Sequence, residues 1–257
     1  MVNYMPIREG KVLWLVLILL VVAIFVFSLY KIISSLYDYS ESSKTYDNLT
    51  VDIITPNIPD LPEDTIKTES APIMVDFDSF IEQNGDVVGW LFCENTPINY
   101  PVLQSTDNNY YLRKMINKKY NIAGSIFMDY RSQSDMSSLN TIIYGHNMKN
   151  DTMFGTFTEY KKQSYYDKHP VLWFLTPEHN YKIELIAGYV TSSTSDVYKD
   201  FYSKDELNSH IAQSIDKSTF ISSADYTLGD KIMTLSTCSY KYNNARYVLI
   251  GKITEID

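Results

Sequence analysis

One apolar segment near the N-terminus constrains this chain more than any other feature. Residues 12–30 contain no charged side chain, and Ser28 is the one break in the run. At about 1.5 Å of rise per residue, a helix of this length comes close to spanning a hydrocarbon core of about 30 Å. The sequence therefore predicts one transmembrane helix, with membrane attachment through residues 12–30.

Two other interpretations of this segment stay open, namely a buried core helix and a cleaved signal peptide. A cleaved signal peptide needs small residues after the apolar run, whereas this run ends in Phe27–Tyr30, so an uncleaved anchor is favoured. Arg8 and Lys11 precede the run, and the positive-inside rule places residues 1–11 in the cytoplasm. Everything after residue 30 is then expected outside the cell membrane.

Composition excludes several classes of function. The net charge is −9, which argues against nucleic-acid binding, because phosphate contacts need clustered Lys and Arg. Two cysteines, Cys93 and Cys238, are too few for a disulfide scaffold, and no histidine is spaced from them as in a zinc site. No acidic cluster has a calcium-ligand pattern. We therefore expect no metal or other cofactor, and a monomer.

The rest of the chain divides into a stalk and a folded domain. Residues 31–75 are rich in acidic side chains, and four prolines punctuate their second half, which favours an extended spacer. The first part, about 32–46, can continue as a helix out of the membrane. The pattern changes at Asp76, and residues 76–257 are expected to form one folded domain.

That domain is predicted to be mostly β. Tyrosine is abundant at 22 residues, and aromatic residues favour strands. Short apolar or alternating runs with turn signals between them predict a barrel or sandwich. These runs are 89–93, 98–103, 124–129, 141–144, 171–175, 181–190, 231–237 and 246–253. A few helices are expected around them, at 76–84, at 152–161 capped by Asp151 or Thr152, and at 204–215 with Leu207, Ile211 and Ile215 as a packing stripe.

Three residues at strand ends suit acyl transfer when they are taken together. Cys238 ends an apolar run, His146 follows Gly145 at the end of another, and Arg246 begins the last strand, eight residues after Cys238. Each alone is more often a structural residue. If the last two strands form a hairpin, Cys238 and Arg246 lie close together. Alternation with Val248 predicts that Arg246 points inward, where an arginine needs either a salt bridge or a functional reason.

The chemistry of these three residue types is complementary. A cysteine thiolate attacks a carbonyl carbon, a histidine protonates a leaving amine, and an arginine offers several fixed donors to a developing oxyanion.

At this point the sequence resembles the sortase family. Residues 234–238, Thr-Leu-Ser-Thr-Cys, resemble the family's cysteine signature, and Arg246 follows at a family-like spacing. Residues 144–148, Tyr-Gly-His-Asn-Met, resemble its histidine motif. The similarity extends over about 76–257, and the helix expected before the seventh strand makes class B the most similar group.

The resemblance implies an eight-stranded sortase-type β-barrel and a transpeptidase. Such enzymes cleave a sorting signal of a secreted protein after a threonine, hold it as a thioester, and transfer it to an amine of a cell-wall precursor. It implies that Cys238 is the nucleophile, His146 the acid and base, and Arg246 the oxyanion ligand. It also suggests that the peptide groove contains Ser236, Tyr144, Asn108 and Leu112, although Asn108, Tyr144 and Leu112 fit turn and core positions equally well.

Two alternatives to a transpeptidase stay open at this level. A cysteine peptidase that releases its product to water would use the same cysteine and histidine. A non-enzymatic wall-binding module would explain the anchor and stalk equally well. Cys93 is expected to be a core thiol, although a disulfide with Cys238 stays open, and His169, His179 and His210 are expected at the surface.

Overall fold

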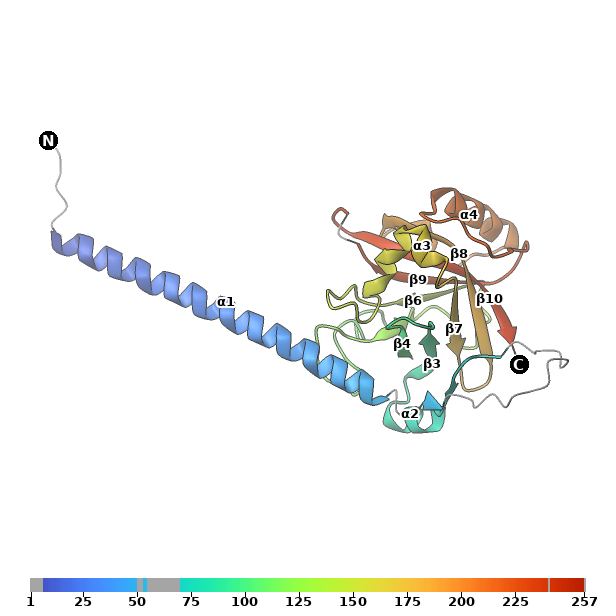
Figure 1. Ribbon diagram of the computed structural model, residues 1–257, viewed down its shortest axis with the longest axis horizontal. Helices are drawn as coiled ribbons and strands as arrows, with labels where there is room; N and C mark the ends of the chain where they lie inside the picture. Colours follow the sequence, from blue (N-terminus) through green and yellow to red (C-terminus); the bar gives the residue numbers. More distant parts are fainter. Residues whose placement is uncertain (1–6, 50–52, 55–69, 240, 257) are drawn as a thin grey trace.

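The computed structural model describes residues 7–49, 53–54, 70–239 and 241–256, and it joins one long helix to a β-barrel (Figure 1). Helix α1 runs from Ile7 to Leu49 and contains the predicted segment 12–30. In the part of the chain that is described, it is the one helix long and apolar enough to cross a membrane. No residue of its apolar window is buried by the rest of the chain.

Eight strands of the described residues close into a barrel in the order β10-β8-β7-β3-β4-β5-β6-β9. Their bounds are β3 (Val87–Phe92), β4 (Asn99–Gln104), β5 (Ile126–Met128), β6 (Asn140–Tyr144), β7 (Val171–Leu175), β8 (Asn180–Ser192), β9 (Ile232–Cys238) and β10 (Ala245–Ile256). The pairs β4–β5 and β6–β9 are parallel, and the remaining pairs are antiparallel. A small pair, β1 (Ile53–Ile54) and β2 (Met74–Val75), lies outside the barrel.

The predicted fold class is confirmed, and each predicted strand overlaps one barrel strand. The largest difference is at the end of β10, which continues to Ile256 because it pairs with β8 as far as Asn180. Cross-strand pairing with the long strand β8 therefore extends β10 through last residues that carry little apolar pattern of their own.

Helix α4 (Lys204–Lys217) covers the outer face of the barrel over β8, β9 and β10 (Figure 1). Its Leu207 and Ile211 are buried in one cluster with Val248 and Ile250. The predicted stripe was wrong at its end, because Ile215 is 48% exposed. The alternate residues of β10, such as Leu249, belong to the main core instead. Both faces of this hairpin are therefore apolar, and the face of Val248 is the outer one.

The other helices are short. Helix α2 (Phe77–Gln83) begins at Asp76, whose carboxylate accepts hydrogen bonds from the backbone and hydroxyl of Ser79. The helix predicted at 152–161 begins later, as the 3-10 helix η2 (Gly155–Lys161), followed by α3 (Gln163–Tyr166). The predicted caps were wrong, because Asp151 and Met153 have φ of 62° and 54°, and this left-handed backbone cannot belong to a helix.

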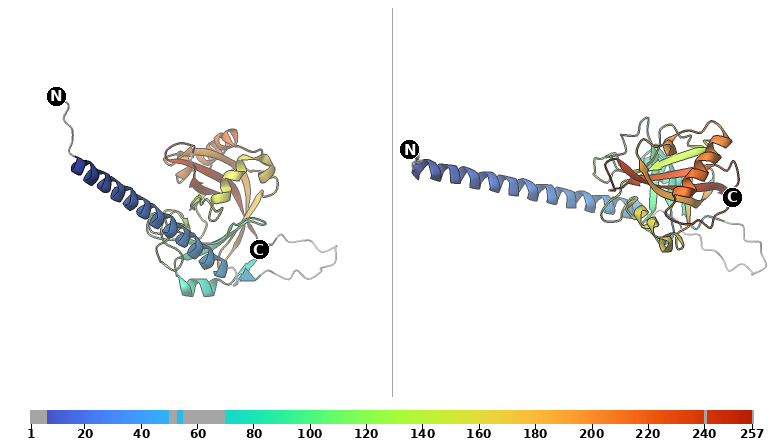
Figure 2. Two further views of the ribbon diagram at one scale, coloured as in Figure 1. Left: turned by 60° about the vertical axis from the view of Figure 1, so that its left-hand side comes forward. Right: turned by 90° about the horizontal axis from the view of Figure 1, so that it is seen from above.

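The end of α1 packs on the domain rather than standing free. Ser42, Tyr46 and Leu49 are buried. The Tyr46 hydroxyl donates to the Gly124 carbonyl at 2.9 Å, and the Asn121 amide donates to the Asp38 carbonyl at 2.9 Å. The views of Figure 2 show α1 leaving the domain from this contact. The expected stalk, 31–75, is therefore helical and docked in its first part, while its prolines at 56, 59 and 62 lie outside the described residues.

Candidate active site

A groove on the outer side of the barrel brings together every site residue that the sequence predicted. Its volume is about 490 Å³. Its walls come from β6, β9 and β10, from the loop between β4 and β5, and from the loop after β8. The predicted residues that line it are Asn108, Leu112, Tyr144, His146, Ser236, Cys238 and Arg246.

Cys238 and Arg246 face each other across the β9–β10 hairpin. They are direct partners in the antiparallel register, as the sequence predicted. The hairpin end is tied by a hydrogen bond of 2.9 Å from the Ser239 amide to the Ala245 carbonyl. Both side chains are half-buried. A thiol and a guanidinium thus share the floor of one groove.

The predicted inward direction of Arg246 was wrong. Arg246 shares its face with Val248, and that face is the outer surface of the barrel, which α4 covers farther along the hairpin. No carboxylate of the described residues lies within ion-pair distance of Arg246, and the one side-chain hydrogen bond that it forms with a described residue goes to the adjacent Ala245 carbonyl at 3.1 Å. A salt bridge therefore does not explain this arginine, and its remaining donors are available to a ligand in the groove.

His146 is fixed at the end of β6 by its neighbours. A methyl group at Gly145 would lie 2.5 Å from Ile126 and 2.7 Å from Phe154, so close approach of the backbone requires glycine there. The Gly145 amide donates to Ser236 at 3.1 Å and extends the parallel pairing with β9. The Asn147 amide then donates to the Cys238 carbonyl at 2.8 Å, which ties the histidine loop to the cysteine strand.

The ring of His146 is also oriented by the loop between β4 and β5. Its Nε2 lies 2.7 Å from the Leu112 carbonyl oxygen. Because a carbonyl only accepts, Nε2 carries the proton in the neutral ring, and Nδ1 is left as the acceptor. Burial lowers the pKa of His146 below its ordinary 6.5, and the nearby charges of Arg113 and Arg246 add to this effect. The imidazole is therefore neutral at neutral pH.

A buried carboxylate that the sequence did not single out organises the far side of the groove. Asp129 is fully buried. It accepts hydrogen bonds from Asn108 and the Tyr144 hydroxyl, both at 2.9 Å, and from the Arg131 guanidinium at 2.8 and 2.9 Å. Burial alone would raise the pKa of Asp129, but these donors lower it below its ordinary value. Asn108 and Tyr144 are thus held at the groove by one charge.

The segment after β8 supplies a wall that the sequence also missed. The Tyr198 hydroxyl lies 2.8 Å from the Ser236 hydroxyl, and its ring stacks on Tyr144 at 6.0 Å. Burial raises the pKa of Tyr198 to about 12, so the phenol is neutral. This segment has neither strand nor helix periodicity. Because the chain contains 22 tyrosines, the sequence alone did not distinguish Tyr198 as a groove residue.

The remaining chemistry-bearing residues lie elsewhere. Cys93 is a buried free thiol whose pKa burial raises to about 11, as expected for a core cysteine, and Cys238 is also free. His179 is exposed as predicted, whereas His169 and His210 are half-buried. Among the described residues, no group of His, Cys, Asp and Glu is arranged to hold a metal ion.

Comparisons with known proteins agree on one family. The family model of the sortase domain matches residues 91–254. Sortase B of Staphylococcus aureus (strain NCTC 8325 / PS 47) is 31% identical over 252 residues, which cover 97% of this chain and 99% of that protein.

Two solved structures show the same similarity. A Staphylococcus aureus sortase B–substrate complex has a TM-score of 0.67 and 34% identity, covering 70% of this chain and 85% of that chain. Sortase B from B. anthracis in complex with AAEK1 has a TM-score of 0.72 and 31% identity, covering 86% of this chain and 99% of that chain.

Proposed function

The chain belongs to the sortase family and is similar to its class B members, and we propose that its groove anchors secreted proteins to the cell wall through Cys238. Sortases are cysteine transpeptidases. Membership of this family therefore excludes the alternative of a wall-binding module without enzyme activity. The observation that carries the proposal is the convergence of a thiol, a neutral imidazole and an unpaired guanidinium on one groove.

In the first step, the Cys238 sulfur attacks the carbonyl carbon of the threonine in a sorting signal. The thiol proton passes to Nδ1 of His146, and the oxyanion receives hydrogen bonds from Arg246. The C–N bond then breaks, and His146 returns the proton to the leaving amine. The products are a thioester on Cys238 and the released C-terminal fragment.

In the second step, an amine of a cell-wall precursor attacks the thioester. Neutral His146 accepts a proton from the attacking amine and returns it to the departing sulfur. An amide forms and the Cys238 thiol is regenerated. The enzyme therefore ends the cycle in the protonation states in which it began.

The peptide itself would occupy the part of the groove bounded by Asn108, Leu112, Tyr144 and Ser236. Asn108 and Ser236 offer hydrogen bonds to a peptide backbone, while Leu112, at 38% exposed, offers an apolar contact. Similarity to a Staphylococcus aureus sortase B–substrate complex supports binding of a sortase substrate by this chain.

The remaining parts of the proposal concern location. Helix α1 would anchor the chain through residues 12–30, with residues 1–11 in the cytoplasm and the catalytic domain, 76–257, outside. The support is the single exposed apolar helix of the described residues and the basic residues that precede it.

The test is a covalent adduct. The full chain in detergent is incubated with peptides carrying NPxTx-like and xPxTG-like signals, and its intact mass is measured. We expect an adduct that ends at the threonine of one signal and that is absent in Cys238→Ala. A folded wild-type protein that forms no adduct with any signal, or a Cys238→Ala protein that still cleaves, would contradict the assignment.

Product analysis with an added amine separates transfer from hydrolysis. An amide product is expected, and a free acid as the sole product would favour the plain peptidase.

A further inference from the structure

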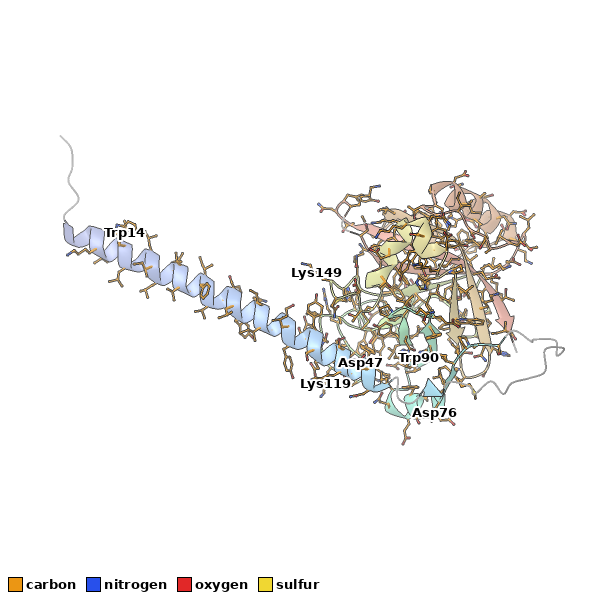
Figure 3. All side chains as sticks on the ribbon, in the orientation of Figure 1. Trp14, Asp47, Asp76, Trp90, Lys119 and Lys149 are labelled. Carbon is orange, nitrogen blue, oxygen red and sulfur yellow. The ribbon has the colours of Figure 1, made fainter. Side chains whose placement is uncertain are left out.

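Past Lys31, whose ammonium folds back over the Phe27 ring at 5.8 Å, apolar side chains again lie exposed on α1. Ile32, Ile33, Leu36 and Tyr37 are all between 57% and 67% exposed. Trp14 is 69% exposed near the other end of the helix (Figure 3), and aromatic residues mark the two interfaces of a membrane helix. Trp14 and Tyr37 are about 23 residues apart, or about 35 Å, which matches a hydrocarbon core of about 30 Å with its boundaries. The outer surface of the membrane is thus expected near Tyr37.

The domain meets α1 at this same level. Asp38 directly follows Tyr37, and its carbonyl accepts a hydrogen bond of 2.9 Å from Asn121. The Tyr46 hydroxyl holds Gly124 two helical turns farther along. The segment before Asn121 is therefore fixed beside the helix where it leaves the bilayer.

That segment carries a concentration of positive charge in an acidic chain. Residues 113–120 contain four cations and no acidic residue, whereas the whole chain has a net charge of −9. The name basic patch is used here for these four cations, Arg113, Lys114, Lys118 and Lys119, together with Lys149, which lies across α1 from Lys119 in the view of Figure 3. Figure 3 places Lys119 and Lys149 on the side of the domain from which α1 departs.

The local backbone presents this charge outward. Lys114 pairs with Tyr120 across a tight turn, and Lys118 near its tip has φ of 63°. Met115 is buried beneath the turn, while Lys119 and Tyr120 are exposed, Tyr120 at 66%. An exposed tyrosine beside lysines suits an interface that is apolar on one side and charged on the other.

Neighbouring acidic groups neutralise only part of the patch. Lys118 lies 3.2 Å from the Asp86 carboxylate in a solvent-exposed pair. The Lys114 ammonium lies over the Tyr110 ring at 4.1 Å. Neither Lys119 nor Lys149 forms an ion pair with a described residue, so both remain available to an external anion.

We propose that the basic patch docks on anionic lipid headgroups of the membrane that α1 spans. The ligand chemistry is a layer of lipid phosphates, within reach of lysine side chains fixed at headgroup height. Surface charge attracts such segments within about one Debye length, about 8 Å at physiological salt. The inference rests on the proposed membrane anchoring, and it extends that anchoring from one helix to a second contact.

Docking of this segment would orient the peptide groove as well as the domain. The same loop carries Asn108 and Leu112 of the groove, and the Leu112 carbonyl holds the His146 ring. A contact at residues 113–120 therefore sets the height and direction at which the groove faces a substrate near the membrane.

The experiment measures amide hydrogen exchange of the full chain in nanodiscs. One set contains phosphatidylcholine alone, and the other contains in addition about 30% phosphatidylglycerol, at low and high salt. The amides of Met115, Lys118 and Asn121 are hydrogen-bonded within the turn, so their exchange reports its opening. We expect slower exchange of residues 113–121 in anionic discs, with the protection lost at high salt.

Charge reversal supplies the specificity control. Lys119→Glu with Lys149→Glu should weaken the protection by about 25-fold for each site, because each reversal changes two units of charge at about fivefold per unit. The matched control is Lys168→Glu with Lys204→Glu, two exposed lysines outside the patch, which should leave the protection unchanged.

The contrary outcomes are distinct from failure of the proposed function. Equal exchange in neutral and anionic discs would overturn the docking, as would protection by soluble polyphosphate without protection by anionic discs. Adduct formation at Cys238 is measured on the same samples. An active enzyme without lipid-dependent protection leaves the transpeptidase intact, whereas a chain that does not enter discs overturns the anchoring.

Discussion

Replacing Asp129 by asparagine tests whether one buried charge holds the groove together. The fully buried carboxylate accepts hydrogen bonds from Asn108, from the Tyr144 hydroxyl, and from both the backbone amide and, twice, the guanidinium of Arg131. Asparagine keeps one acceptor oxygen and turns an NH₂ group towards donors, so we expect about two of these bonds to be lost. Hydrogen bonds to a charged group contribute about 1.5–3 kcal/mol each. The Arg131 side chain is 41% exposed, so water can replace part of its bond to the carboxylate. We therefore expect the free energy of unfolding to fall by about 3 kcal/mol, the lower end of the range for two bonds.

The assay is thermal unfolding of the full chain in detergent. For a domain of about 150–250 residues, 1 kcal/mol shifts the Tm by about 2–4 °C, so Asp129→Asn should lower it by about 6–12 °C. Asp135→Asn is the control. Asp135 is an exposed carboxylate in the same loop between β5 and β6, and it accepts a hydrogen bond from the Ser137 amide. Its effect should stay within about 0.5 kcal/mol.

The same variant has a functional signature. Asn108 and Tyr144 lose their common acceptor, whereas Cys238 does not contact Asp129. We therefore expect KM for the peptide to rise more than kcat falls. A Tm within about 1 °C of wild type, or an unchanged KM, would refute the claim that Asp129 positions the groove.

Four further predictions concern the groove and the two cysteines. Arg113→Gln removes a cation that lowers the pKa of His146, so the acid limb of adduct formation should move to higher pH; an unmoved limb would contradict this electrostatic assignment. The lowered pKa of His146 also means that the unfolded chain binds more protons below about pH 6.5, so stability should fall on acidification through that value, and His146→Gln should weaken the dependence in pH-resolved denaturant titrations. Gly145→Ala places a methyl group 2.5 Å from the Ile126 side chain, so the free energy of unfolding should fall by about 1–3 kcal/mol and the adduct should form more slowly. A melting curve identical to that of wild type would show instead that the neighbouring side chains can move to accommodate the methyl group. Cys93→Ala should still form the peptide adduct that Cys238→Ala loses, as intact mass will show, since the buried Cys93 thiol lies outside the groove.

Pattern and resemblance predicted the strands and the pairing of Cys238 with Arg246, because a hairpin fixes its own register over a short distance. They did not predict which way Arg246 points. Alternation assigned Arg246 to the face of Val248, but both faces of β10 are apolar, one in the main core and one under α4. In such a strand the pattern shows which residues share a face, and only tertiary packing shows which face is outside.

The Asp129 network lay beyond the sequence for a related reason. Its partners Asn108 and Tyr144 are 21 and 15 residues away, and the parallel β4–β5 pair brings one of them into reach. Tyr198 joins the groove from a segment without periodicity, 38 residues from Ser236. Short-range pattern carries no information on such contacts, whereas the family resemblance indicated Asn108, Tyr144 and Leu112 as groove residues before any geometry was known.

The docking of α1 changes where the catalytic unit begins. The buried Tyr46 bonds to Gly124, and a methyl group on Gly124 would lie 2.6 Å from the Leu112 carbonyl, which itself accepts the bond of His146. A chain that starts at residue 76 lacks Tyr46 and Leu49, two buried side chains that contribute about 1.5–3 kcal/mol each.

The free energy of unfolding of residues 76–257 should therefore be about 3–6 kcal/mol lower than that of residues 31–257, which lowers the urea midpoint. The shorter chain should also form the peptide adduct more slowly. Tyr46→Phe in the longer chain separates the two effects, because it keeps most of the buried area and removes the bond to Gly124. If the shorter chain matched the longer one in both midpoint and rate, α1 would be only a tether. A slower adduct rate in Tyr46→Phe, with a small change in midpoint, would instead show that the helix leaving the membrane positions the histidine.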